Sequence, residues 1–183
     1  MKMFKRLFLA TLILVFLLTN SDAAPIGGTK DDATCAITVT VDDVAEWASD
    51  FAAIALANIS SQSDSPEGSQ TATLYTNADL NINADNTASS QLNTTDGGSS
   101  DVLVTEYKIE FDAAGATTGA AGAQGATYQT YDVFLSTTPA AVTHGLGDGE
   151  IDVTLYCRAS NEGGIMADAG DYTATQTLTI TWP

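Results

Sequence analysis

The sequence predicts an all-β protein, an antiparallel β-sandwich of about seven to nine strands in residues 34–183. Short runs in which apolar and polar residues alternate recur along the chain, as in strands that bury one face. Breaks rich in Gly, Ser and Asn separate these runs at intervals of about 8 to 15 residues. No apolar stripe at helical spacing is long or regular enough to predict a helical core.

Residues 1–24 have the pattern of an export signal peptide. Lys2, Lys5 and Arg6 precede twelve apolar residues at 7–18, and small or polar residues follow at 19–24. A retained membrane helix needs roughly 20 apolar residues. We therefore expect a secreted protein, extracellular or at the cell surface and not inserted in a membrane after signal removal, with residues 25–33 as an N-terminal extension.

The chain after residue 24 is strongly acidic. It keeps three basic residues, Lys30, Lys108 and Arg158, against twenty-two acidic ones. So few cations cannot neutralise phosphates, which argues against nucleic acid and anionic lipid as partners. Cations, neutral polymers and further copies of the chain remain as candidates.

The first predicted strand covers residues 34–44, where Cys35, Ile37, Val39 and Val41 share one face. Residues 44–59 are ambiguous, because they fit either a helical stripe or an irregular edge strand. We favour a short turn or helix at 45–49 followed by a strand, and a loop at 60–69.

The middle of the chain alternates between strands and polar breaks. Residues 70–84 predict one long strand or a hairpin bent near Asn77, and residues 101–111 predict a strongly alternating strand. The segment between them, 85–100, is polar. Residues 112–126, almost wholly Gly, Ala and Thr, predict a mobile loop.

Three further strands are expected at residues 127–136, 139–144 and 150–158, with a glycine-rich turn at 145–149. The last strand, 171–182, carries threonine at each odd position from 173 to 181. Threonine suits a solvated pleated face, because its β-branched stem favours extended backbone. The first and last strands have the most regular patterns.

Two cysteines in an exported chain predict a single disulfide, Cys35 to Cys157. Each shares a strand face with large aliphatic residues, so the bond is expected inside the core. Closing a loop of this length contributes about 4 to 5 kcal/mol in the chain-entropy model.

The two ends of the chain resemble secreted fimbrial β-sandwich proteins, including the spore coat protein U family of pilus subunits. The resembling stretches are Cys-Ala-Ile-Thr-Val-Thr at 35–40, Phe51 and Leu56, Val-Thr-Leu-Tyr at 153–156, and the Ala-Gly-Asp-Tyr entry at 169–172 into the final threonine-rich strand. The middle of the chain has no counterpart. The resemblance implies an immunoglobulin-like, non-enzymatic subunit that self-associates into a filament, with a chaperone possible during export.

In such an assembly a strand of one subunit completes the sheet of its neighbour. Residues 25–33 offer only Ile26 as a large apolar residue, so the strand-exchange candidates are Ile37, Val39 and Val41. Under this reading Cys35 bonds to Cys157 of the neighbouring copy, and the bond within one chain remains the alternative.

Two acidic rows are candidate calcium sites, because Ca²⁺ prefers carboxylate and amide oxygens. The first row has two-residue spacing, and the second follows a glycine turn; a solvated outer face is the alternative for both. The rows are Asn77, Asp79, Asn81, Asn83 and Asp85, and Asp148, Glu150 and Asp152.

Asn58 and Asn93 match the glycan acceptor pattern. His144 is the single histidine, and no Ser-His-Asp, zinc or phosphate-loop motif can be assembled around it. A monomeric exported module that binds glycans or calcium is the alternative to a filament subunit, and an enzyme ranks third.

Overall fold

The computed structural model describes residues 34–94, 101–112, 117–147, 149–163 and 165–183. The expected signal peptide, the extension at 25–33 and Asp148 lie outside the described residues. The chain divides into two units, Met1–Asp42 and Asp43–Pro183. Every strand and helix that the structure describes belongs to the second unit.

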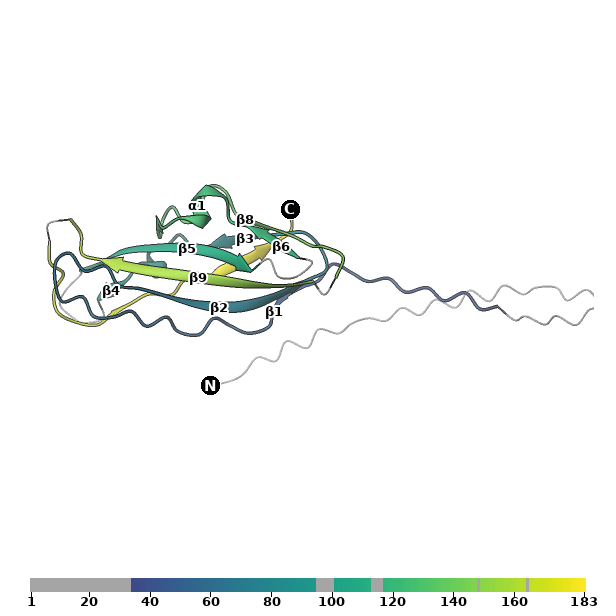
Figure 1. Cartoon of the computed structure of the whole chain (residues 1–183), viewed down its shortest axis with the longest axis horizontal. Coiled ribbons are helices and arrows are strands. Elements are labelled where there is room, and N and C mark those ends of the chain that lie inside the picture. The colour runs from purple at the N-terminus through teal and green to yellow at the C-terminus, as the bar shows by residue number, and fades with distance from the viewer. Residues whose placement is uncertain (1–33, 95–100, 113–116, 148, 164) are drawn as a thin grey trace, which may run out of the picture. The chain divides into compact units, whose positions relative to one another are not determined.

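The second unit is an antiparallel β-sandwich, which confirms the predicted fold class (Figure 1). Its described residues form nine strands in two main sheets. The first sheet has the order β1 (Ala45–Trp47), β2 (Glu67–Thr76), β9 (Glu150–Ser160), β5 (Val104–Asp112) and β7 (Gln129–Thr130). The second has the order β11 (Leu178–Thr181), β3 (Leu80–Ala84), β8 (Ala140–Thr143) and β6 (Thr118–Ala120).

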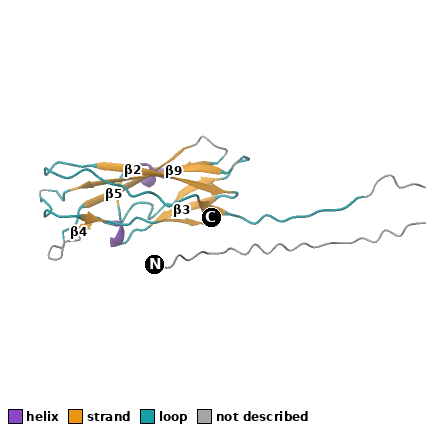
Figure 2. Cartoon of the chain, turned by 90° about the horizontal axis from the view of Figure 1, so that it is seen from below, coloured by secondary structure: helices purple, strands orange, loops and turns teal. Residues whose placement is uncertain are grey.

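Smaller elements lie between these strands. β4 (Asn93–Thr94) pairs with β10 (Tyr172–Thr173), and the described residues include two short helices, η1 (Ala88–Ser90) and α1 (Gly122–Ala126), as Figure 2 shows. Neither helix in the part of the chain that the structure describes has the length and apolar character needed to cross a membrane.

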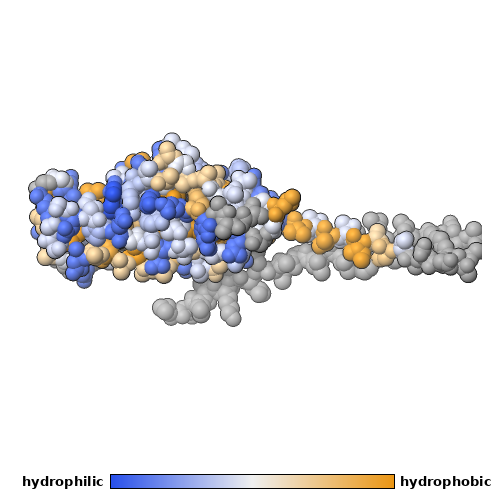
Figure 3. Space-filling model, viewed as in Figure 1, coloured by the Kyte–Doolittle hydropathy of each residue, from blue (hydrophilic) through white to orange (hydrophobic). Residues whose placement is uncertain are grey.

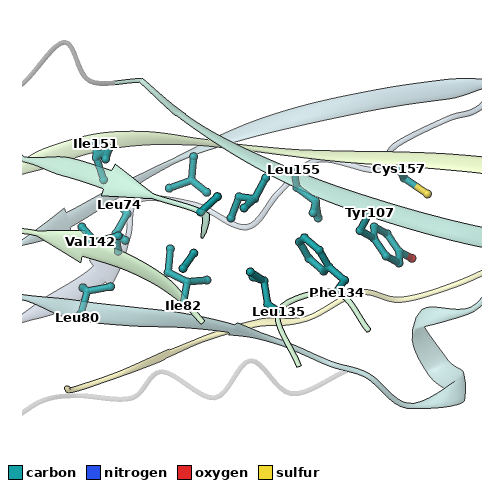
Figure 4. Close-up of a cluster of buried hydrophobic side chains, with 14 residues drawn as sticks. Leu74, Leu80, Ile82, Tyr107, Phe134, Leu135, Val142, Ile151, Leu155 and Cys157 are labelled. Atoms are coloured by element: carbon teal, nitrogen blue, oxygen red, sulfur yellow. The ribbon is translucent and has the colours of Figure 1, made fainter. Parts of the chain in front are cut away.

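The core lies between the two sheets, and strict alternation along the strands builds it (Figure 4). Along β9 every second residue is buried, and the residues between them are half-exposed. Fully burying an aliphatic or aromatic side chain contributes about 1.5–3 kcal/mol. The largest buried side chains come from both sheets and the β7–β8 connection: Leu74, Leu80, Ile82, Ile109, Phe134, Leu135, Val142, Ile151 and Val153.

The strand register defines the two ends of the sandwich. We call pole A the end where β1 begins, β2 ends and β9 begins, because Ala45 pairs with Thr76 and Tyr75 with Glu150. Pole B is the opposite end, where β9 finishes at Ser160 beside Val104. β11 runs from pole B to pole A, since its Thr181 pairs with Asn81 near the start of β3.

Several predicted elements were wrong. Residues 45–47 form β1 where a turn or helix was expected, and residues 50–59 form no strand. Residues 127–136 contain only the two-residue β7, and the expected last strand, 171–182, is divided into β10 and β11.

Residues 34–44 have strand-like alternation but form no strand, and β1 starts at Ala45. The segment expected as a mobile loop instead forms β6 and α1 in the part that the structure describes, 117–126. The small residues of this segment let it pack closely against the core. A Cβ atom added at the buried Gly125 would lie 2.8 Å from Leu135 Cδ2 and 3.1 Å from Ile109 Cγ2.

Gly149 sets the geometry of the entry into β9. It has a φ of +69°, and a Cβ there would collide with the carbonyl oxygen of Thr76. The Thr76 N–H donates to the Gly149 carbonyl over 2.8 Å. We expect Gly149→Ala to lower the free energy of unfolding by about 1–3 kcal/mol, because the strained backbone and the collision both raise the energy of the folded state. Urea unfolding measures this, and an unchanged midpoint contradicts it.

Candidate functional site

One long edge of the sandwich is formed by β1 with the chain that follows it, and by β11. Residues 48–56 run beside β2, because Ala48 N–H donates to Thr73 O (2.9 Å) and Gln70 Nε2 donates to Ala53 O (3.4 Å). Among the described residues, the backbone of 49–59 makes no hydrogen bond to another backbone group. On the opposite side, β11 has β3 as its one strand partner in the described part of the chain.

The same edge leaves apolar side chains partly uncovered. Phe51, Ile54 and Leu56 pack against the core from one side, and Leu178 and Ile180 pack against it from the other. All five remain half-exposed, whereas the corresponding side chains of β9 are buried. An additional strand at this edge would cover these side chains and pair the free backbone groups.

A groove opens along this edge near pole B. It has a volume of about 640 Å³ and runs between residues 54–59 and residues 166–172. Leu103 of the β4–β5 connection and Ala159 of β9 also line it. The groove therefore reaches from solvent to the end of the five-stranded sheet.

Residues 34–42 carry an exposed apolar face. Ile37, Val39 and Val41 are 87 %, 71 % and 74 % exposed, and they alternate with Ala36, Thr38 and Thr40. Figure 3 shows apolar side chains recurring along this segment. The three predicted strand-exchange residues are thus exposed apolar side chains of a segment that belongs to neither sheet.

The expected disulfide is absent, because both cysteines are free. Cys157 points into the core from β9 and is 7 % exposed, whereas Cys35 lies exposed in the segment that joins no sheet. The prediction failed because an even cysteine count gives no information on distance. The alternative bond between neighbouring copies stays a prediction, and Cys157 is not among the residues that line the groove.

We expect one fast-reacting thiol in the native protein. Burial raises the pKa of Cys157 to about 11, so at pH 8 this thiol stays protonated and shielded from reagents. Exposed Cys35 is open to them. Ellman titration checks this: one thiol should react in buffer and two in guanidinium, and two fast thiols in buffer would contradict it.

The first acidic row lies mostly on the four-stranded sheet. Asn81 and Asn83 lie on the outer face of β3, with threonine partners on β11 and an alanine on β8 rather than further acids. Asp79 Oδ1 accepts the N–H of His144 over 2.9 Å. Hydrogen bonds from Ser89 and Thr87 lower the pKa of Asp85. These contacts give the acidic side chains local structural roles.

The second acidic row lies on the other sheet. Glu150 and Asp152 are on the outer face of β9, and Thr73 Oγ1 donates to Asp152 Oδ1 over 2.6 Å. Within the residues that the structure describes, no three His, Cys, Asp or Glu side chains are grouped closely enough to hold a metal ion. Calcium binding by either row stays a prediction, which melting with and without a chelator tests.

The two glycan acceptor positions differ in exposure. Asn58 is exposed, on the segment beside the groove. Asn93 is half-buried in β4, and its side-chain amide donates to the carbonyls of Gln91 and Ala88. A glycan on Asn93 would disrupt these two hydrogen bonds, and glycosylation of either residue stays a prediction.

Sequence reasoning missed a cluster of cations and tyrosines on the outer face of the five-stranded sheet. Lys108 Nζ lies 4.1 Å from the ring centre of Tyr156 and 2.8 Å from Glu110 Oε1. The hydrogen bond to Glu110 raises the pKa of Lys108 and lowers that of Glu110. Arg158 pairs with Glu106 at 2.7 Å and stacks over Tyr128. The register of β5 against β9 creates this cluster, which links strands rather than opening a binding site.

The sequence gives no match in a scan against protein-family models, and no curated protein matches it. The resemblance to fimbrial subunits therefore rests on the sequence patterns alone. The strongest functional feature of the described residues is the open edge, together with the exposed apolar face of residues 34–42.

Proposed function

We propose that the protein is a secreted structural subunit of an extracellular filament. In this assembly residues 35–41 of one copy add as a strand to the open edge of the next. One observation carries the proposal: among the described residues, Ile37, Val39 and Val41 are exposed in a segment that belongs to neither sheet, and β11 is an edge strand with one side unpaired. The partner is a further copy of the chain, and the role is mechanical rather than catalytic.

The added strand is longer than β11 itself. Seven extended residues span about 23 Å and the four residues of β11 about 13 Å, so the added strand would pair with β11 and continue beside residues 174–177. Ile37, Val39 and Val41 recur at about 6.8 Å, the same period as the half-buried inward residues of 174–180. Each aliphatic side chain of the added strand can therefore pack against the half-buried inward side chains of residues 174–180.

The charges also agree. Residues 34–41 contain no charged side chain, although the chain as a whole has a formal net charge of −17. Asp42 and Asp43 follow immediately, at the point where the segment joins the sandwich unit. An uncharged strand can approach the acidic surface of another copy without strong repulsion.

The strand should add antiparallel to β11. β11 offers a free edge of four residues, and antiparallel pairing is slightly more stable for each residue than parallel pairing. Since β11 ends at pole A, the added strand then finishes with Val41 at pole B. Its own sandwich lies beyond pole B of the acceptor, and repetition of this head-to-tail contact gives an open chain of copies.

Parallel addition has a different outcome. Val41 would then finish at pole A of the acceptor, so the two copies would face each other through pole A. Each copy could donate to the other, which produces a closed pair. The direction of the strand therefore decides between a filament and a dimer.

Peptide binding tests the proposal. The host is the full chain with Ile37→Thr, Val39→Thr and Val41→Thr, which blocks self-assembly, and the ligand is a synthetic peptide of residues 34–44. Burying three aliphatic side chains contributes about 1.5–3 kcal/mol each, against the entropy cost of association. We expect one peptide to bind per chain with micromolar affinity and to raise the melting temperature.

The matched control is the same peptide with the three threonine substitutions, which should not bind. Absence of binding by the native peptide, in calorimetry and in melting, would overturn the proposal. It would favour the monomeric module instead.

A further inference from the structure

We infer that pole A of one copy packs directly against pole B of the next, through exposed apolar side chains on both poles. This inference rests on the proposed strand addition. It adds a second contact surface, which the added strand itself does not include.

The connector between the added strand and the sandwich is too short to keep the copies apart. Val41 is the last inward residue of the added strand, and β1 begins at Ala45. The chain between these two residues spans at most about 14 Å. With Val41 at pole B of the acceptor, pole A of the donor must lie within that distance, so the two surfaces meet.

Pole A presents apolar side chains that the fold of a single copy leaves uncovered. Leu146, in the turn between β8 and β9, is 103 % exposed, and it lies between two glycines where a polar residue would serve the turn equally well. Trp182, which follows β11, is 48 % exposed, and Val44, which precedes β1, is 50 % exposed. All three lie where strands begin or end at this pole.

Pole B also presents exposed apolar side chains. Ile165 and Met166 are 58 % and 52 % exposed in the connection that follows β9, and Val102, just before β5, is 36 % exposed. Met166 also lines the groove near this pole. The apolar surface of pole B is therefore continuous with the proposed acceptor edge, and the same copy that supplies the strand covers both.

Cross-linking tests the inference. The full chain carries Cys35→Ser and Cys157→Ala, so that no native thiol reacts, together with Leu146→Cys and Met166→Cys. A short bis-maleimide then joins the two new thiols where pole A meets pole B. Each copy has one site at each pole, so we expect a ladder of covalent oligomers on denaturing gels. Either single substitution should give no cross-linked product, because each contact then has a thiol on one side only.

The matched control replaces Leu146→Cys with Ala141→Cys, at an exposed position on the outer face of β8 and away from both poles. It should give no ladder. Negative-stain microscopy of the same samples separates the two proposals. Filaments without a ladder overturn the pole contact and leave strand addition standing, whereas the absence of filaments overturns both. Efficient dimers from Leu146→Cys alone, as in a closed pair, overturn the pole contact.

Discussion

The triple variant Ile37→Thr, Val39→Thr and Val41→Thr is expected to form no filaments and to remain monomeric. Threonine keeps the β-branched shape and the extended preference of the segment. It loses the apolar transfer energy and places three hydroxyl groups against a dry core, at about 1–2 kcal/mol each. Together these losses weaken each contact between copies by at least about a hundredfold. Negative-stain microscopy and light scattering measure the result.

The fold of the variant should be unaffected, because residues 34–42 belong to a different unit from the sandwich. Its melting temperature should equal that of the unassembled native chain. The matched control substitutes the opposite face, with Ala36→Ser, Thr38→Ser and Thr40→Ser, and should still assemble. Filaments in the triple variant, or equal loss of filaments in the control, would show that the apolar face of this segment does not join the copies.

Much of the sandwich can be predicted from local pattern. Along β9, Ile151, Val153 and Leu155 are buried as their alternation predicts, and the odd-numbered threonines of 173–181 are exposed. The reason is geometric: successive side chains of a strand point to opposite faces, so a two-residue period specifies the buried face without knowledge of the partner strands. Both sheets follow this rule.

The same rule explains why residues 34–44 were assigned wrongly. Alternation predicts a strand that buries Ile37, Val39 and Val41, but it carries no information on which sheet receives them or in which molecule. For residues 117–126 the composition predicted a mobile loop, but the structure has β6 and α1 there. A run of Gly and Ala has little apolar surface to bury, yet Gly125 packs against Ile109 and Leu135 because it is small.

The acceptor edge could not be predicted for a related reason. Residues 49–59 carry Phe51, Ile54 and Leu56 at a spacing that fits a helical stripe as well as an irregular edge strand, so the pattern does not decide between them. What makes this edge of the sandwich an acceptor is the unpaired side of β11, and an unpaired side leaves no pattern in the sequence. The groove near pole B likewise depends on Leu103, just before β5, and Ala159, on β9, which lie far apart in the sequence.

If the strand adds antiparallel to β11, a designed fusion that carries the strand at its own C-terminus should be much more stable than its host. A copy of residues 34–41 is appended after Pro183 through four added turn residues, in a host that carries the three threonine substitutions in its own segment. β11 ends at pole A, so an appended strand can turn back along its free edge toward pole B. A short loop permits this antiparallel return, whereas a parallel strand needs a crossover of a dozen or more residues.

We expect the fusion to be monomeric and to gain about 3 kcal/mol in the free energy of unfolding, because the apolar burial and the new main-chain hydrogen bonds together exceed the entropy lost by the appended strand. For a domain of this size such a gain raises the melting temperature by about 6–12 °C. The matched control appends the same segment with threonine at the three apolar positions and should melt like the host. Stabilisation that appears only with a linker of about fifteen residues would indicate parallel addition, because only that length spans the sandwich. In that case a closed pair would replace the filament.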